Sequence, residues 1–371
     1  MNENLSFYSL YSKYKNLDFS TYFKKVNDDE IINSFNKRSL NPDNLLALLS
    51  VKAENYIETM AQKAKDLSLQ HFGRAILLYT PLYLSNYCIN ECLYCGFNSK
   101  VKFKRKKLSL EEVEKEATFI AKTGLQHILI LTGESEQITP LSYIKECIQL
   151  LKKYFTSISI EIFPLKTNEY KELVALGVDG LTIYQEVYDE KIYSQVHLKG
   201  PKKDYAHRLD TAQRAGDAKM RTINIGALLG LGDWRKEAFF MLLHAKYLQD
   251  LYPEIEISVS LPRLRPQVKN FKAISKVSDK NIVQIITAAR IFLPRLGITL
   301  STRENSSLRD NLLPLGITKI SAGSTTAVGG HINSKEKDVQ FEIADQRDVA
   351  TIRRMLLAKG YQPVLKDWVG V

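Results

Sequence analysis

The sequence predicts an α/β protein in which eight parallel strands close into a TIM-type (βα)8 barrel, preceded by an N-terminal helical extension. Two observations carry this prediction. Beyond Arg74, short apolar runs alternate with amphipathic segments of helical periodicity, eight of each. Polar and glycine-containing motifs directly follow the apolar runs, and a barrel of this kind places its chemistry at the carboxyl ends of its strands.

The N-terminal helical extension is predicted over residues 1–71. Apolar side chains recur at helical spacing in the segments 43–49 and 55–67, and Asn41 and Pro42 interrupt the pattern before them. The barrel domain, with its C-terminal segment, is predicted over residues 72–371. No internal repeat, low-complexity segment or linker rich in Pro, Gly or Ser divides it further.

Apolar runs define the strands of the barrel, and amphipathic periodicity defines the helices between them. Capping chemistry supports several helix starts, such as Ser109 before Glu111 and Glu112, and Ser278 before Asp279. The predicted strands lie near 75–84, 127–132, 157–162, 179–184, 222–229, 255–261, 297–301 and 317–321. The predicted helices lie near 109–123, 140–154, 167–176, 204–218, 234–250, 279–293, 306–313 and 345–359.

Composition points to an ordinary globular protein in the cytoplasm. Hydrophobic residues make up 44% of the 371 residues and charged residues 25%. No apolar run approaches the length of a membrane span, and the start MNENLSFYSLYSKYKN lacks the apolar core of a signal peptide. Four cysteines, three of them clustered, do not make a disulfide framework. We therefore expect no membrane partner.

The net charge of +11 raises the question of a nucleic-acid partner. The lysines are spread over most predicted helices, however, and the one dense run is KVKFKRKK at 100–107. A solvated basic face explains this distribution, so we expect no nucleic acid to bind. The run could also serve as a landing site for an acidic electron donor of the flavodoxin or ferredoxin type.

The stretch that organises the chain is 83–98, YLSNYCINECLYCGFN, directly after the first apolar run. Cys88, Cys92 and Cys95 stand in it at C-x3-C-x2-C spacing, so a single loop can turn three thiols onto one inorganic centre. A structural zinc ion would need a fourth thiolate or imidazole nearby, and none follows. A cubane iron–sulfur cluster held by three cysteines keeps one iron free of protein ligands. Three incidental buried cysteines are the alternative.

This spacing, with the aromatic Tyr94 just before the third cysteine, resembles the motif of the radical S-adenosylmethionine (SAM) superfamily. The resemblance implies a [4Fe–4S] cluster on Cys88, Cys92 and Cys95, with the amino and carboxylate groups of SAM on the fourth iron. Cys147 lies in a helical pattern, where a small buried side chain is expected.

Further blocks of the sequence resemble the SAM-binding motifs of that superfamily. Thr132-Gly133-Glu134 is similar to its Gly-Gly-Glu motif, with Thr132 in place of the first glycine, and implies that Glu134 binds the methionine amino group. Arg208, in the stretch YAHR, is at the position implied for the methionine carboxylate, which a planar guanidinium fits in a two-pronged way. A surface salt bridge is the alternative for Arg208.

Three other residues are assigned to the cofactor on the same resemblance. Glu161 lies in the block IEIFPL, and Glu186, which ends the fourth strand, is expected at the ribose. Gly226, in IGALLGL, is expected where the adenine lies against the fifth strand. The alternatives are a loop-stabilising carboxylate for Glu186 and a close backbone approach for Gly226.

Together with TIYQEVY, HLKGPKKDYAHRLDTAQRAG, SLPRLRP, LSTRE and KDW, these blocks identify the chain, from about Phe72 to Trp368, as similar to the aromatic amino acid lyases of the superfamily, the tyrosine lyases above all. That resemblance implies cleavage of L-tyrosine to 2-iminoacetate and p-cresol, with SAM consumed to 5′-deoxyadenosine and methionine. Arg303 is expected to anchor the substrate carboxylate, with Ser321 assisting. An ion pair between Arg303 and Glu304 is the alternative.

The resemblance also implies partners. The product would pass to the thiazole synthase of thiamine biosynthesis. Among related lyases, the tyrosine lyase of hydrogenase maturation is improbable because no cysteine follows Cys147. A tryptophan lyase of antibiotic biosynthesis stays open, since phenol and indole are told apart by pocket shape. A non-catalytic iron–sulfur carrier and a metal-independent barrel enzyme also stay open.

Overall fold

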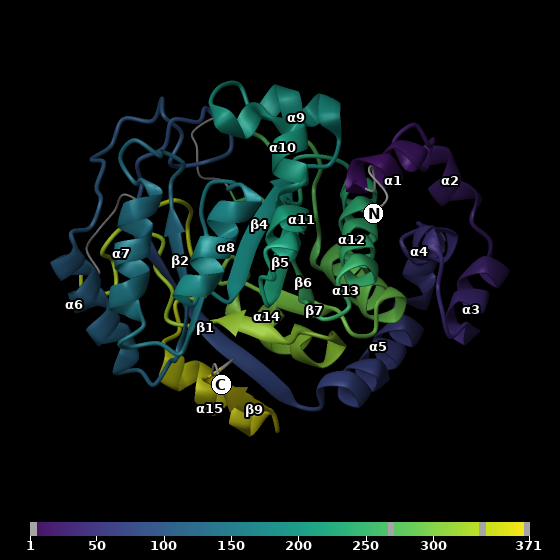
Figure 1. Cartoon of the computed structure of the whole chain (residues 1–371). Helices are drawn as coiled ribbons and strands as arrows, with labels where there is room; N and C mark the ends of the chain where they lie inside the picture. Colours follow the sequence, from purple (N-terminus) through teal and green to yellow (C-terminus); the bar gives the residue numbers. More distant parts are fainter. Residues whose placement is uncertain (1–5, 266–270, 334–338, 367–371) are drawn as a thin grey trace.

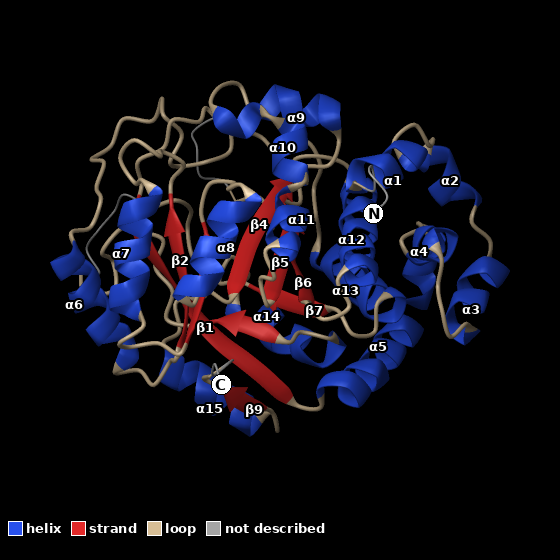
Figure 2. Ribbon diagram, viewed as in Figure 1, coloured by secondary structure: helices blue, strands red, loops and turns tan. Residues whose placement is uncertain are grey.

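The computed structural model describes residues 6–265, 271–333 and 339–366. Its centre is a closed parallel barrel in which β1 pairs with both β2 and β8 and every other strand pairs with its neighbours in sequence (Figures 1 and 2). The predicted (βα)8 barrel is confirmed. Pro266 of the block SLPRLRP, and Asp367 and Trp368 of the block KDW, lie outside the described residues.

The barrel strands begin and end close to the predicted positions. A short ninth strand, which the sequence did not predict, pairs in parallel with the start of β1. The strands are β1 (Ala75–Ser85), β2 (His127–Thr132), β3 (Ser157–Glu161), β4 (Gly180–Glu186), β5 (Thr222–Ala227), β6 (Glu256–Ser260), β7 (Gly297–Leu300), β8 (Lys319–Ser321) and β9 (Gln362–Val364).

The predicted helices also form, with one break. The predicted helix at 204–218 is two helices, because Asp210 caps the first of them with ψ near 0° instead of continuing it. The helices around the barrel are α6 (Leu110–Ala121), α7 (Leu141–Leu151), α8 (Thr167–Leu176), α9 (Glu190–Val196), η2 (Pro201–Lys203), α10 (Tyr205–Leu209), α11 (Thr211–Asp217), α12 (Trp234–Leu251), α13 (Asp279–Phe292), α14 (Ser306–Leu312), η3 (Leu313–Leu315) and α15 (Val349–Ala358). Of these, α9, η2 and η3 were not predicted.

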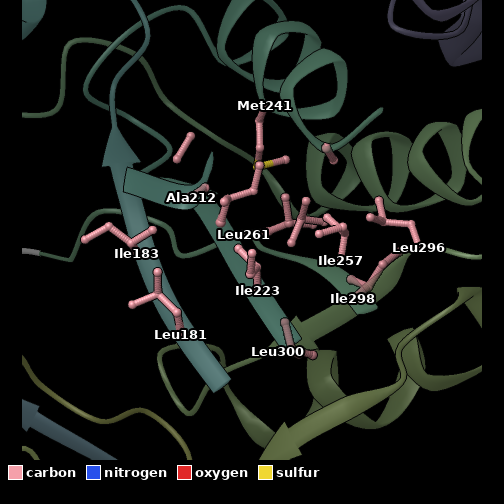
Figure 3. Packing of buried hydrophobic residues seen from close by; sticks show 14 of the residues in the cluster. Leu181, Ile183, Ala212, Ile223, Met241, Ile257, Leu261, Leu296, Ile298 and Leu300 are labelled. Carbon is pink, nitrogen blue, oxygen red and sulfur yellow. The ribbon is translucent and has the colours of Figure 1, made fainter. Parts of the chain in front are cut away.

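The strand residues alternate between two environments. Side chains that point out of the barrel are apolar and pack under the helices: Figure 3 shows Leu181, Ile183, Ile223 and Ile257 together with Met241 of α12. Side chains that point into the barrel are often polar. The Asn224 amide, for example, donates a hydrogen bond to Ser260 Oγ at 2.9 Å. The barrel interior therefore tolerates charge at its carboxyl end, where the site lies.

The N-terminal helices pack against one side of the barrel, over α12 and α13 (Figure 1). The Gln284 amide of α13 donates to the carbonyls of Leu48 and Ser50 at 3.0 and 2.8 Å, and both parts share one hydrophobic core. The boundary at residue 71 stays a prediction. Across the described ranges, no helix is both long and apolar enough to cross a membrane. These helices are α1 (Phe7–Tyr14), α2 (Phe19–Lys25), α3 (Asp28–Asn36), α4 (Pro42–Leu48), η1 (Lys52–Tyr56) and α5 (Ile57–Phe72).

Candidate active site

The loop after β1 brings its three cysteines to one cavity at the carboxyl end of the barrel. Cys88, Cys92 and Cys95 all line this space, which we call the cluster cavity. Cys147, in contrast, is fully buried on α7, as expected for a small core side chain. The other predicted residues that line the cluster cavity are Gly133, Glu134, Glu161, Glu186 and Arg208.

Backbone pairing holds the cysteine loop from one side. Cys92 forms an antiparallel bridge with His197, and the Leu93 amide donates to the carbonyl of Val196 at 3.0 Å. The partner segment follows α9. Sequence reasoning missed α9 because the helix spans only seven residues and has no long apolar periodicity.

Arg105 holds the same loop from the other side. Its guanidinium donates to the carbonyls of Asn86 at 2.6 Å, Phe97 at 2.9 Å and Asn98 at 2.7 Å. These carbonyls flank the cysteines at both ends. The prediction of a solvated basic face over the run 100–107 is wrong for Arg105. The only signal was its residue type, since an arginine carries five donors in a fixed fork and a lysine does not.

Glu134 and Arg208 form a buried ion pair beside the cysteines. Arg208 Nη1 lies 2.9 Å from Glu134 Oε1, and Arg208 Nε donates to the Tyr184 carbonyl at 2.7 Å. The Asn90 amide donates to the other Glu134 oxygen at 2.8 Å. Since only 6% of Arg208 is exposed, the alternative of a surface salt bridge is wrong. Glu134 and Arg208, which were predicted to bind the amino and carboxylate groups of the methionine part of SAM, thus lie side by side.

Gly133 lets the end of β2 pack against the cysteine loop. A Cβ atom at this position would lie 2.3 Å from the Tyr87 carbonyl oxygen and 3.2 Å from Cys88 Cβ. Any side chain would therefore push the loop away from Glu134.

Glu186 ends β4 at a bulge, with a φ of 71°, so its carboxylate turns into the cavity. Lys202 Nζ donates to it at 2.7 Å. Burial disfavours the charged form of Glu186, but Lys202 and Arg208 outweigh burial and lower the pKa of this carboxyl. Sequence reasoning missed Lys202, although the resemblance block HLKGPKKDYAHRLDTAQRAG contains it.

Tyr94 is fixed by a histidine that sequence reasoning also missed. His197 Nδ1 lies 2.9 Å from the Tyr193 carbonyl and must donate to it, which leaves Nε2 as an acceptor. The Tyr94 hydroxyl therefore donates to His197 Nε2, at 2.8 Å. Burial keeps the pKa of His197 far below its usual range, so the imidazole is neutral and this arrangement is stable.

A second space, the substrate cavity, lies beside the cluster cavity and encloses about 1020 Å³ with its open mouth. Several predicted residues line it, and tyrosines cover much of its wall. These residues include Tyr79, Tyr83, Tyr94, Glu161, Tyr184, Glu186, Arg303 and Ser321.

Arg303 projects into the substrate cavity with its guanidinium carbon 3.4 Å from the centre of the Phe341 ring. Its neighbour Glu304 instead pairs with Arg263, at 2.9 Å from Nε, and with Arg265 at 3.3 Å. The alternative of an ion pair between Arg303 and Glu304 is therefore wrong. Ser321 also lines the cavity, and its hydroxyl accepts a hydrogen bond from the Thr302 amide at 3.2 Å.

Gly226 is not among the residues that line either cavity. A Cβ atom there would lie 2.7 Å from the Tyr184 ring and 2.9 Å from the Ser260 carbonyl oxygen. Close packing of Tyr184 and β6 against this residue explains why it is a glycine, in agreement with the alternative interpretation of a close backbone approach. The structure thus gathers the other predicted site residues but leaves Gly226 behind Tyr184.

The cluster cavity fits a [4Fe–4S] cluster with SAM on its open iron. Among the described lining residues, three cysteines and no histidine supply the donors. In the described ranges no three His, Cys, Asp or Glu side chains close around a single metal ion. A cluster needs its thiols farther apart than one ion does. The paired Glu134 and Arg208 offer one negative and one positive group to the zwitterionic end of SAM.

Comparison with known proteins agrees with this fit. Residues 82–243 match the family model of the radical SAM superfamily, and residues 260–362 match that of the biotin and thiamin synthesis associated domain. Fold and site together define a radical SAM barrel enzyme.

Two relatives show which family of radical SAM enzymes the chain belongs to. The chain is 40% identical over 340 residues to the 2-iminoacetate synthase of Salmonella typhimurium, covering 91% of this chain and 90% of the relative. It is 38% identical over 360 residues to the 2-iminoacetate synthase of Escherichia coli, covering 96% of each. The chain belongs to the 2-iminoacetate synthase family. Among solved structures it resembles the FeFe-hydrogenase maturase HydG from Carboxydothermus hydrogenoformans, with a TM-score of 0.83 and 33% identity over 97% of this chain and 82% of that one.

Family membership confirms the predicted class. The protein is a radical SAM lyase that uses a [4Fe–4S] cluster and SAM. A non-catalytic iron–sulfur carrier and a metal-independent barrel enzyme, the two other classes left open by the sequence, are therefore wrong.

Proposed function

We propose that the protein cleaves the Cα–Cβ bond of L-tyrosine to 2-iminoacetate, also called dehydroglycine, and p-cresol, for thiazole formation in thiamine biosynthesis. Family membership supports the reaction. The observation that supports its location is that the two cavities share Tyr83, Cys95, Glu161 and Glu186 in their walls. A reactive species formed in the cluster cavity can therefore reach a substrate in the other cavity without meeting bulk water.

The residues of the cluster cavity divide the work of holding the cofactors. Cys88, Cys92 and Cys95 would hold the cluster. Glu134 would bind the positively charged amino group of SAM, and Arg208 would bind its negatively charged carboxylate. Each side chain carries the charge opposite to that of the group it would bind, and both line the cluster cavity.

Two further residues would hold the nucleoside part of SAM. Glu186, kept ionised by Lys202, would accept hydrogen bonds from the ribose hydroxyls. Tyr94, fixed by His197, offers a rigid aromatic wall on the side of the substrate cavity. For Gly226, an adenine contact would require Tyr184 to move.

Arg303 would anchor the substrate carboxylate. Its guanidinium is held against Phe341, and no described residue forms an ion pair with it, so its two-pronged donor edge is available. Ser321 supports the position indirectly, because its hydroxyl binds the backbone of Thr302 next to Arg303.

The cluster held by Cys88, Cys92 and Cys95 would supply the one-electron chemistry that consumes SAM to 5′-deoxyadenosine and methionine, and the hydrogen would come from the substrate amino group. The chain's own task is to orient the amino group for this hydrogen removal. It does so by fixing the substrate carboxylate, and by surrounding both molecules with buried side chains that exclude water.

Product analysis tests the proposal. Anaerobically reconstituted protein receives SAM and dithionite with either tyrosine or tryptophan. We expect p-cresol and 5′-deoxyadenosine in similar amounts from tyrosine, glyoxylate from hydrolysis of the imine, and no indole product from tryptophan. Indole products from tryptophan in place of p-cresol would assign the chain to tryptophan cleavage, and SAM cleavage that neither amino acid stimulates would contradict both.

Two partners follow from this function. The imine hydrolyses in water, so direct transfer to the thiazole synthase of the thiamine pathway would preserve it. An acidic flavodoxin or ferredoxin would supply electrons, docking on the exposed lysines beside the cysteine loop. With both partners, the reaction would take place in the cytoplasm.

A further inference from the structure

Glu161, the last residue of β3, stands where the two cavities meet. Its side chain lines both of them. The alternation of β3 explains its direction, because Ser159 and Glu161 point into the barrel while Ile158 and Ile160 are buried under the helices. The sequence prediction placed Glu161 with the cofactor, but its position makes it equally accessible from the substrate side.

Among the three glutamates that line the cluster cavity, Glu161 is the one without a partner in the described protein. Glu134 is paired with Arg208 at 2.9 Å, and Glu186 with Lys202 at 2.7 Å. Glu161 has no ion pair and no side-chain hydrogen bond to any part of the chain that the structure describes, although protein surrounds it. Glu161 is partly exposed toward the cavities that it lines, so its carboxylate, which has no partner among the described residues, is available to a ligand group there.

The substrate cavity is also lined by a positively charged side chain, Arg303, that has no ion-pair partner among the described residues. Its charge acts on Glu161 from across the cavity. An α-amino acid carries one carboxylate and one ammonium group on the same carbon. The cavity therefore presents one positive and one negative side chain to a ligand with the complementary pair.

We propose that Glu161 binds the amino group of the substrate and accepts a proton from its ammonium form. In this transfer an N–H bond breaks, an O–H bond forms on the carboxylate, and the electron pair stays on nitrogen. The neutral amine then offers a hydrogen that can be removed as an atom. The inference rests on the proposed function, because only that reaction begins at the substrate amino group.

The charges around Glu161 suit a proton acceptor. Burial, followed by the neighbouring charge of Glu186, raises the pKa of Glu161 to about 7, although Lys202, Arg208 and Arg303 oppose the rise. The pKa of Glu161 therefore lies closer to that of an amino group than the pKa of an ordinary glutamate does, so transfer of the ammonium proton to Glu161 is less unfavourable. An unperturbed glutamate would be a far weaker base.

Three phenols also face Glu161, and the thiol of Cys95 lines both cavities with it. Tyr79 and Tyr83 come from β1 and Tyr184 from β4, and burial raises the pKa of each. All three stay neutral near pH 7, so none of them competes for the proton.

Truncated ligands separate the roles of the two side chains. The cluster-loaded enzyme with SAM, but without reductant, is titrated with tyrosine, with tyramine, which lacks the carboxylate, and with 3-(4-hydroxyphenyl)propanoate, which lacks the amine. We expect Glu161→Gln to weaken tyrosine and tyramine by about tenfold or more and to leave the propanoate nearly unchanged. Arg303→Gln should show the reverse, weakening tyrosine and the propanoate and sparing tyramine.

A control and a pH profile complete the experiment. Glu172→Gln, on the exposed side of α8, should change none of the three affinities. After addition of reductant, p-cresol formation by the wild type should rise with pH through about 7, and Glu161→Gln should lose that dependence.

Two results would overturn the proposal. One is a Glu161→Gln variant that weakens SAM while tyrosine and tyramine bind as before, which would return Glu161 to the cofactor. The other is an equal loss of all three ligands, which would indicate a structural role. If the wild type neither binds tyrosine nor forms p-cresol, the proposed function itself fails, a result distinct from both.

Discussion

Two arginines of this site differ in whether they form an ion pair with another residue of the protein. Arg208 is paired with Glu134 inside the cluster cavity, whereas Arg303 rests on an aromatic ring and faces open space. This difference predicts different consequences when each is replaced, because loss of Arg208 also strands a buried carboxylate.

Replacing Arg303 should uncouple the reaction. Arg303→Gln keeps the cluster cavity intact, so the variant should still cleave SAM slowly but form little p-cresol. Loss of a buried charged contact should weaken tyrosine binding by about 2–5 kcal/mol. The ratio of 5′-deoxyadenosine to p-cresol measures the effect, and an unchanged p-cresol yield would remove Arg303 from the substrate site.

Replacing the cysteines tests the cluster assignment. Cys88→Ala, Cys92→Ala and Cys95→Ala should each abolish the brown chromophore and 5′-deoxyadenosine formation, since all three line the cluster cavity. Cys147→Ala is the matched control, because Cys147 is buried on α7. Iron content and the visible spectrum decide, and loss of iron from the Cys147 variant would contradict the assignment.

Sequence reasoning found the site residues that belong to local motifs. The cysteines and Glu134 stand at spacings that are visible along the chain. Lys202, His197 and Arg105 could not be found in the same way, because each acts through a contact that folding creates. Gly226 stands in a local motif, but the sequence could not show that Tyr184, and not a ligand, occupies the space beside it.

At the scale of elements, the cysteine loop is held between two supports that lie outside the barrel strands. The segment after α9 pairs with its backbone, and Arg105 binds carbonyls at both of its ends. The eight strands were predictable because each contains a short apolar run between segments of helical periodicity. The short α9 and the break at Asp210 were not, because their geometry depends on local caps and tertiary contacts.

The Arg105 support predicts a change in cluster retention. Arg105→Lys keeps the positive charge but cannot reach several carbonyls at once, so the loop should be weakened by about 2 kcal/mol or more. The measurement is the rate of iron loss to a chelator, which should increase several-fold. Lys102→Gln, on the exposed part of the same run, should leave the rate unchanged. Equal rates of iron loss in wild type and Arg105→Lys would show that Arg105 does not hold the cysteine loop in place.

At the scale of the whole molecule, the barrel brings residues at or directly after the ends of all eight barrel strands to two adjoining cavities. Alternation along the strands makes this possible, with apolar side chains under the helices and polar ones inside. The excess positive charge lies mostly outside that site. Part of it, at Lys100, Lys102 and Lys104, is exposed beside the cysteine loop.

Charge reversal at these three lysines should impair electron delivery without harming the site. With an acidic flavodoxin as reductant, the triple variant to Glu should turn over more slowly, and wild-type turnover should fall as salt increases. With dithionite, variant and wild type should react equally. If flavodoxin supports both proteins equally at low salt, the donor docks elsewhere.

Transfer of the imine is a property of the assembled pathway. We expect a weak, salt-sensitive complex with the thiazole synthase, and thiazole formation that persists when a reagent traps free glyoxylate. A thiazole yield that follows the concentration of free imine, with no binding at low salt, would mean that the product travels through solution.

The arrangement of both ligands across the adjoining cavities is tested most directly by an anaerobic crystal structure of the cluster-loaded enzyme with SAM and tyrosine. We expect SAM between Glu134 and Arg208, the tyrosine carboxylate on Arg303, and the tyrosine amino group at Glu161. A tyrosine bound outside the substrate cavity, or bound there with its carboxylate away from Arg303, would contradict this arrangement.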